Sequence, residues 1–113
     1  MSGLQTQFDI QPNACILTLS GNAAATDAGR LDHAIDNAIA SRPDLLVIDL
    51  SNLAFIGSFA IGALIRLEKS VRADSGTVRL AAPQPQIHTL LTQSRLDQKL
   101  PIFPTLESAL IKR

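Results

Sequence analysis

Residues 45–65 read LLVIDLSNLAFIGSFAIGALI, and this stretch decides the fold class. Its first six residues, Leu45 to Leu50, form a nearly continuous apolar run, which is typical of a strand buried within a parallel sheet. A short turn follows, and from Phe59 onward apolar residues recur at the spacing of a helix. A buried strand followed directly by a helix indicates an α/β protein.

The rest of the chain repeats this alternation of strands and helices. We expect Gly21 to end the second strand, residues 52–57 to form a loop, and Pro101 to mark a strand at the edge of the sheet. The order β-β-α-β-α-β-α-β-α predicts a mixed sheet of about four to five strands with about four helices in a single domain, residues 1–113. The predicted elements are strands at 4–10 and 14–20, a helix from a cap at Thr26 or Asp27 to about residue 40, a strand at 45–50, a helix at 59–73, a strand at 77–81, a helix introduced by Pro83-Gln-Pro85, a short strand at 100–103 and a last helix capped by Thr105.

Composition bounds the possible functions. The chain has 113 residues, of which 46% are hydrophobic and 18% charged, enough for one hydrophobic core. Ten basic and ten acidic residues cancel, so nucleic acid and anionic membranes are not expected as partners. The N-terminus lacks the pattern of a secretory signal, and no apolar run approaches the ~20 residues of a membrane span. We therefore expect a soluble cytoplasmic protein without direct membrane insertion.

Ser58 is the leading candidate for a functional residue. It stands where the predicted second helix begins, so it is close to backbone N–H groups that lack partners within the helix and to the positive end of the helix dipole. A phosphate on its hydroxyl would lie in an environment that favours anions. The alternative is that Ser58 is a simple N-cap, whose hydroxyl accepts a hydrogen bond from the first turn. The two interpretations are compatible.

Catalytic and metal-binding patterns are absent from the sequence. There is no nucleophile elbow, no phosphate-binding glycine loop with a lysine, and no cysteine or acidic cluster at metal-ligand spacing beside His33 or His88. Asp49 is expected to accept hydrogen bonds from nearby loop N–H groups, and Cys15 to be a small buried residue. We therefore expect no enzyme activity, cofactor or metal; hydrolysis through Ser58 and a distant histidine is the remaining enzymatic alternative.

The chain resembles the STAS domain family, the anti-sigma factor antagonists and their relatives. Residues 45–56 are similar to the family's central strand and the segment after it, and residues 58–67 to the helix that follows. Residues 96–110 are similar to the closing segment, and Gly21 stands where the family has a glycine after its second strand. The likeness extends over nearly the whole chain in consistent order and implies the STAS fold.

The resemblance also implies a function. In the best-known branch of the family, an unphosphorylated antagonist binds a serine-kinase anti-sigma factor and so frees the sigma factor; phosphorylation of a serine at the start of the second helix ends this binding, and a phosphatase reverses it. Ser58 occupies the place of that serine. Two positions depart from the pattern: Gly57 replaces the usual aspartate before the serine, and Ala24 stands where the antagonists typically carry an acidic residue.

The predicted partner surface combines the segment after the central strand, the start of the second helix and the turn near residues 21–26. Phe59 is open to two interpretations, as an exposed anchor for a partner or as a residue folded back on the core or on the loop around Phe55. The second functional hypothesis is a STAS module that does not switch, acting as a scaffold or as a soluble subunit of a lipid-handling transporter; an apolar surface suits such permanent contact. The oligomeric state is left open. The predicted partner-binding residues are Ala24, Thr26, Asn52, Gly57, Ser58, Phe59, Ile61 and Gly62.

Overall fold

The computed structural model describes residues 3–111, which fold around a five-stranded sheet. The elements are, in chain order, β1 (Leu4–Ile10), β2 (Cys15–Ala23), the 3₁₀ turn η1 (Ala25–Asp27), α1 (Ala28–Ala40), β3 (Leu45–Ile56), α2 (Ser58–Ala73), β4 (Thr77–Ala81), α3 (Pro85–Gln93), the 3₁₀ turn η2 (Leu96–Gln98), β5 (Ile102–Phe103) and α4 (Leu106–Leu110). β1 and β2 pair antiparallel, and the strands from β2 to β5 run parallel, so that the spatial order is β1-β2-β3-β4-β5. The predicted mixed sheet and element order are confirmed.

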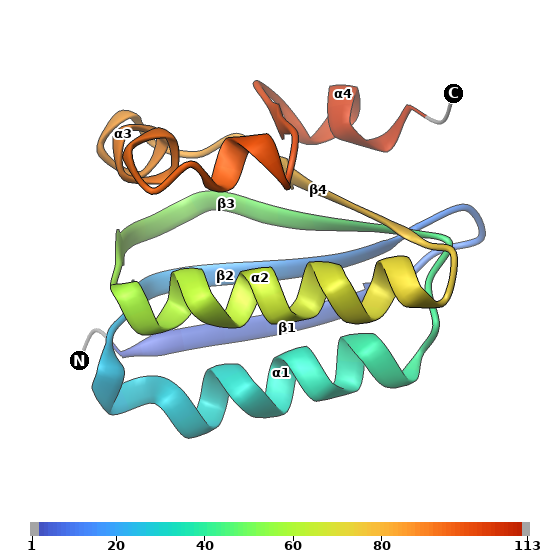
Figure 1. The fold of residues 1–113 in the computed structure, drawn as a ribbon, viewed down its shortest axis with the longest axis horizontal. Coiled ribbons are helices and arrows are strands. Elements are labelled where there is room, and N and C mark those ends of the chain that lie inside the picture. The colour runs from blue at the N-terminus through green and yellow to red at the C-terminus, as the bar shows by residue number, and fades with distance from the viewer. Residues whose placement is uncertain (1–2, 112–113) are drawn as a thin grey trace.

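The helices form layers on the two faces of this sheet. α1 and α2 lie side by side along one face (Figure 1) and close the main core with residues such as Leu17, Ile48 and Leu64. The parallel strands follow one another in spatial order, so right-handed crossovers deliver consecutive helices to the same face. α4 packs on the opposite face, where Ala109 contacts a smaller cluster that includes Val47.

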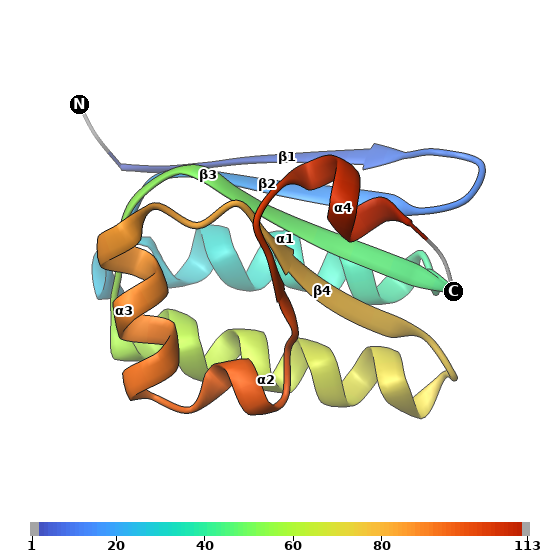
Figure 2. The ribbon, with the colours of Figure 1, turned by 90° about the horizontal axis from the view of Figure 1, so that it is seen from above.

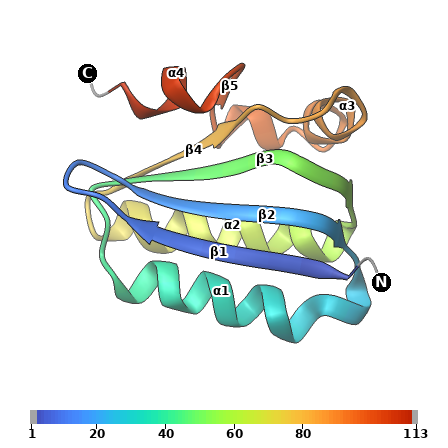
Figure 3. The same cartoon turned by 180° about the vertical axis from the view of Figure 1, so that it is seen from behind.

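The opposite face is covered by helix only in part. Seen from behind, β1 and β2 stand in front of α2 with no helix over them, while α4 lies at the β4–β5 end (Figure 3). The residues of β1 on this side are polar: Gln5 and Gln7 are exposed, and the Gln7 amide donates to the Asp9 carboxylate at 3.2 Å. Such alternation is expected of a strand with one solvated face.

The last third of the chain is held by specific polar contacts. Thr105 caps α4 as predicted, because its hydroxyl accepts from the backbone N–H of Ser108 at 3.0 Å. The Arg79 guanidinium donates to the carbonyl of Ala109 at 2.9 Å and to that of Ile111 at 2.6 Å, and it lies 5.2 Å from the ring centre of Phe103. Arg79 therefore joins β4 to β5 and to the end of α4. β5 is an edge strand, as Pro101 indicated, but it begins only at Ile102, so Pro101 precedes it instead of lying within a strand at 100–103.

Two predicted boundaries are wrong, and both for the same reason. β2 continues through Gly21 to Ala23, and β3 continues through the predicted loop to Ile56. The extended ends pair with each other in parallel, and register shifts between Thr18 and Ser20 and between Gly21 and Asn22 accommodate the irregular spacing. Gly21 permits one of these shifts because its φ of +86° is readily adopted only by glycine.

The start of the first helix also differs from expectation. The chain first makes the 3₁₀ turn η1 and enters α1 only at Ala28. Asp27 takes the N-cap position, but its side chain makes no capping hydrogen bond, and Thr26 lies within the turn. The expected side-chain cap at Thr26 or Asp27 is therefore absent. The predicted end is correct, since α1 stops before Pro43, which disfavours helical geometry at the preceding residue.

Candidate functional site

The candidate site lies where β2 and β3 end side by side. Asn22 pairs with Phe55 and Ala23 with Ile56, and the N–H of Gly57 donates to the carbonyl of Ala23 at 2.9 Å. The chain leaves β2 into η1 and leaves β3 into α2 at this same end of the sheet, opposite the hairpin turn (Figure 2). The pairing thereby joins the two segments that the sequence assigned to a partner surface. Functional groups of open α/β sheets concentrate at such strand ends.

Ser58 is the first residue of α2 and does not cap it. Gly57 occupies the N-cap position with extended geometry (φ −88°, ψ 170°), and no side chain caps the helix. The Ser58 side chain is exposed, and its hydroxyl makes no hydrogen bond within residues 3–111. The interpretation of Ser58 as an N-cap is therefore wrong, because α2 already begins at Ser58, one residue earlier than a cap at Ser58 requires. The hydroxyl remains accessible to an enzyme.

Two phenylalanines flank Ser58 on the surface. Phe55 in β3 is 45% exposed, and Phe59 in the first turn of α2 is 36% exposed. A Cβ atom at Gly57 would lie 3.5 Å from Cε2 of Phe55, so the Phe55 ring packs beside the glycine. Phe59 is thus not folded fully into the core. Phe55 lies within the segment 52–57 that the sequence assigned to the partner surface, although it was not among the predicted partner-binding residues.

The other predicted partner-binding residues differ in exposure. Thr26, Asn52 and Gly62 are exposed, and Ala24 is half-buried beside η1. Ile61 is half-buried and packs against the main core, so it contributes mainly to stability. Gly62 has no atom within 4 Å of a Cβ position, which leaves open space on this side of α2.

Asp49 accepts a backbone hydrogen bond, as its sequence context indicated. The Asp49 carboxylate accepts from the backbone N–H of Ser51 at 3.0 Å, and the Gln84 amide donates to the Ser51 carbonyl at 3.0 Å. These contacts hold the bend of β3 against the start of α3. His33 and His88 are both exposed.

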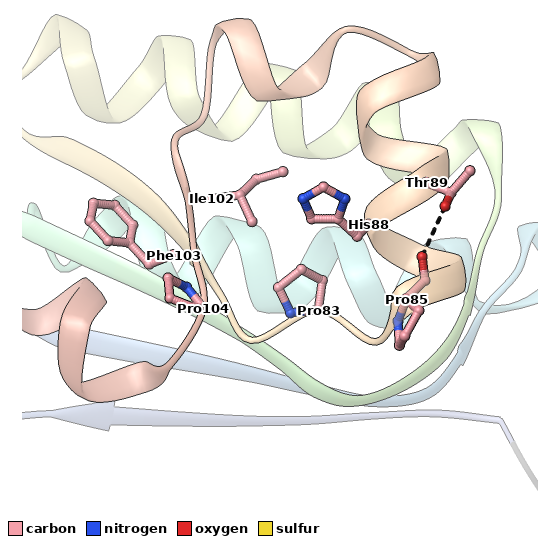
Figure 4. Close-up of a pocket in the computed structure, with 7 residues that line it drawn as sticks. All are labelled: Pro83, Pro85, His88, Thr89, Ile102, Phe103 and Pro104. Carbon is pink, nitrogen blue, oxygen red and sulfur yellow. Dashed lines mark hydrogen bonds between the residues drawn. The ribbon is translucent and has the colours of Figure 1, made fainter.

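A separate cavity of about 580 Å³ lies beyond the ends of β4 and β5. Pro83, Pro85 and Pro104 form much of its wall, and His88 extends toward Ile102 between them (Figure 4). None of the predicted site residues lines it. Within residues 3–111 there is no group of three or more histidine, cysteine or acidic side chains placed to hold a metal ion. Over the same part of the chain, no helix has the length and apolarity to cross a membrane.

Comparison with known proteins defines the family. The STAS domain sequence profile matches residues 5–109, so the chain belongs to the STAS domain family. The anti-sigma F factor antagonist of Paenibacillus polymyxa is 27% identical over 108 residues, 95% of this chain and 92% of that protein. The expected family is thereby confirmed.

Solved structures agree on the fold. The crystal structure of an anti-sigma factor antagonist from Mycobacterium paratuberculosis superimposes with a TM-score of 0.88 at 28% identity, covering 96% of this chain and 92% of that one. A sulfate transporter family protein from Wolinella succinogenes has a TM-score of 0.75 at 17% identity, covering 90% of this chain and 85% of that one. The second likeness concerns the fold alone.

Proposed function

We propose that this chain is an anti-sigma factor antagonist that binds an anti-sigma factor serine kinase, and that phosphorylation of Ser58 ends this binding. The observation that carries the proposal is the exposed hydroxyl of Ser58, which is free of intramolecular hydrogen bonds within residues 3–111 and stands at the start of α2. Similarity to antagonists from two bacteria along almost the whole chain supports the same role.

The proposed switch acts on the partner rather than on the fold. Phosphorylation adds roughly −1.5 to −2 charges at pH 7. α2 begins without a side-chain cap and without an acidic residue in its first turn, so its N–H groups can accept this charge. The folded domain therefore tolerates the phosphate, whereas a partner seated over Ser58 must accommodate a charged group inside the contact. A serine phosphatase would restore the binding form.

The first test is performed on protein from its native cells. The tagged chain is purified, and intact-mass spectrometry with peptide mapping across Ser58 is used to find a species about 80 Da heavier, the mass of one phosphate on the hydroxyl. The anti-sigma factor kinase that copurifies is then produced separately, and its affinity for wild type, Ser58→Ala and Ser58→Asp is measured by calorimetry. We expect Ser58→Ala to bind like wild type and Ser58→Asp to bind at least tenfold more weakly.

The outcomes distinguish the phosphate switch at Ser58 from the antagonist role itself. Equal affinity of Ser58→Ala and Ser58→Asp would exclude the phosphate switch. Absence of any anti-sigma factor partner would exclude the antagonist role itself.

The non-switching module remains the second candidate function. Gly57, Ala24 and the exposed Phe59 favour it, because an uncharged, apolar surface suits permanent contact. Such a protein would act as a scaffold or as a soluble subunit of a lipid-handling transporter. Copurification with transporter subunits instead of a kinase, with Ser58 unmodified under several growth conditions, would favour this alternative.

A further inference from the structure

We infer that Phe55 and Phe59, here called the phenylalanine pair, bind an apolar and uncharged face of the anti-sigma factor. The inference rests on the proposed function and specifies the chemistry of the partner's contact face. It predicts a complex held by burial of aromatic surface and insensitive to salt, in which the pair supplies most of the affinity.

The geometry of the pair suits an anchor. The two rings come from different elements, the end of β3 and the first turn of α2, with Ser58 beside Phe59. The Phe55 backbone is fixed by its pairing with Asn22, and its ring packs along the bare face of Gly57. An aromatic side chain already held in place, as the Phe55 ring is beside Gly57, loses little freedom on binding, which is a property of interface hot spots.

The two segments that carry the pair contain no charged side chains. The chain has ten basic and ten acidic residues, yet none occurs at positions 10–26 or 50–65, the two segments that meet at this site. A charged group of the partner would find no side chain of opposite charge in these two segments; only an anion could gain some stabilisation, from the N-terminus of α2, and a charge buried without a partner costs free energy. Complementarity therefore favours an apolar face.

The exposed area of the pair is enough for only part of a larger contact. At 45% and 36% exposure, two side chains of roughly 200 Å² each present about 160 Å². A standard interface buries about 800 Å² on each partner, so the pair alone is too small to hold a stable complex. The exposed Ala54 and Gly62 and the polar Asn52 and Thr26 can supply the surrounding rim. Central aromatic anchors ringed by neutral contacts are the usual arrangement of hot spots.

The same arrangement explains how Ser58 would control binding. A phosphate beside Phe59 would bring charge into the apolar contact that the pair forms. Removing that charge from water would cost free energy that an apolar partner face does not return. An uncharged contact thus responds to phosphorylation even though Ala24 and Gly57 replace the acidic residues that the resemblance leads one to expect.

The test uses the anti-sigma factor kinase recovered with the wild-type protein as the probe. Its affinity is measured for wild type, Phe55→Ala, Phe59→Ala and the double variant. The matched control is Ile10→Ala: Ile10 is 72% exposed and lies at the hairpin turn, at the far end of the sheet. We expect each phenylalanine variant to bind about 30-fold more weakly and the control to change by less than about twofold.

A second measurement needs no variant. The dissociation constant of the wild-type complex is determined at 50 and 500 mM NaCl, and we expect it to change by less than about threefold, since no close charge pairs cross the contact. Thermal melts verify that each variant is folded. The salt dependence of wild-type binding keeps the inference testable even if a phenylalanine variant fails to fold.

Several results would overturn the inference. A kinase that binds wild type and the double variant equally, or whose affinity falls tenfold or more with salt, would refute the apolar contact while leaving the proposed function intact. Self-association of the wild-type chain that the double variant abolishes would assign the pair to a second copy of this chain. If no kinase binds the wild type, the proposed function fails and the inference fails with it.

Discussion

Gly57 offers a test in which stability and binding should change in opposite directions. Gly57 occupies the N-cap position of α2, where no side chain caps the helix, and its φ of −88° is accessible to any residue. A Cβ at Gly57 would lie 3.4 Å from the Ala23 carbonyl oxygen and 3.5 Å from the Phe55 ring, both ordinary contact distances. Gly57→Asp should therefore add a capping hydrogen bond worth a few tenths of a kcal/mol over glycine. Its charge at the helix N-terminus should add about 0.3–1 kcal/mol.

Together these effects predict that Gly57→Asp raises the free energy of unfolding by about 0.5–1 kcal/mol, or the melting temperature by about 2–5 °C. Urea denaturation of a matched series resolves the two contributions. Gly57→Asn caps without charge, so the Asp–Asn difference isolates the dipole effect and should shrink in 0.5 M NaCl. Gly57→Ala removes the favourable glycine without adding a cap and should be less stable than wild type.

In the kinase-binding assay we expect the more stable variant to bind more weakly. Gly57→Asp places a charge beside Phe55 in the uncharged surface and should weaken binding, whereas Gly57→Asn should weaken it less. A loss of stability in Gly57→Asp would show that the carboxylate cannot reach the N–H groups of the first turn. Tighter binding by Gly57→Asp than by Gly57→Asn would refute the apolar character assigned to the partner's face.

Two further predictions concern stability. Gly76→Ala should lower the free energy of unfolding by about 1–3 kcal/mol, because the new Cβ would collide with the Pro43 carbonyl and lie 2.6 Å from Val71 Cγ1. The control Gly62→Ala, which has open space in the middle of α2, should raise the free energy of unfolding by about 0.5–1 kcal/mol. Equal denaturation midpoints for the two variants would contradict the packing described for Gly76. Arg79→Ala should speed amide hydrogen exchange in α4 but not in α1, because the guanidinium holds the end of α4 through two carbonyls; unchanged exchange in α4 would show that packing alone anchors it.

The fold class could be predicted from local sequence patterns. The apolar run at 45–50 indicated a buried strand, the 3.6-residue spacing after Phe59 indicated α2, and Thr105 marked the cap of α4. Each of these signals depends on interactions within a few residues or on burial of a continuous segment. It can therefore be recognised without knowing which distant segments of the chain pack together. The resemblance of the sequence also indicated the family, and with it Ser58 as a candidate site.

The details of the site were decided by tertiary pairing. The ends of β2 and β3 are strands because they pair with each other across a register shift, and Gly21 also pairs with Leu4 of β1; no local pattern encodes these pairings. At this end of the sheet Gly57 is the N-cap of α2, the Ser58 hydroxyl makes no hydrogen bond within residues 3–111, and Phe55 is exposed beside Gly57. The residue types at the site were therefore set by the sequence, whereas their exposure and arrangement were set by the long-range contact between β2 and β3.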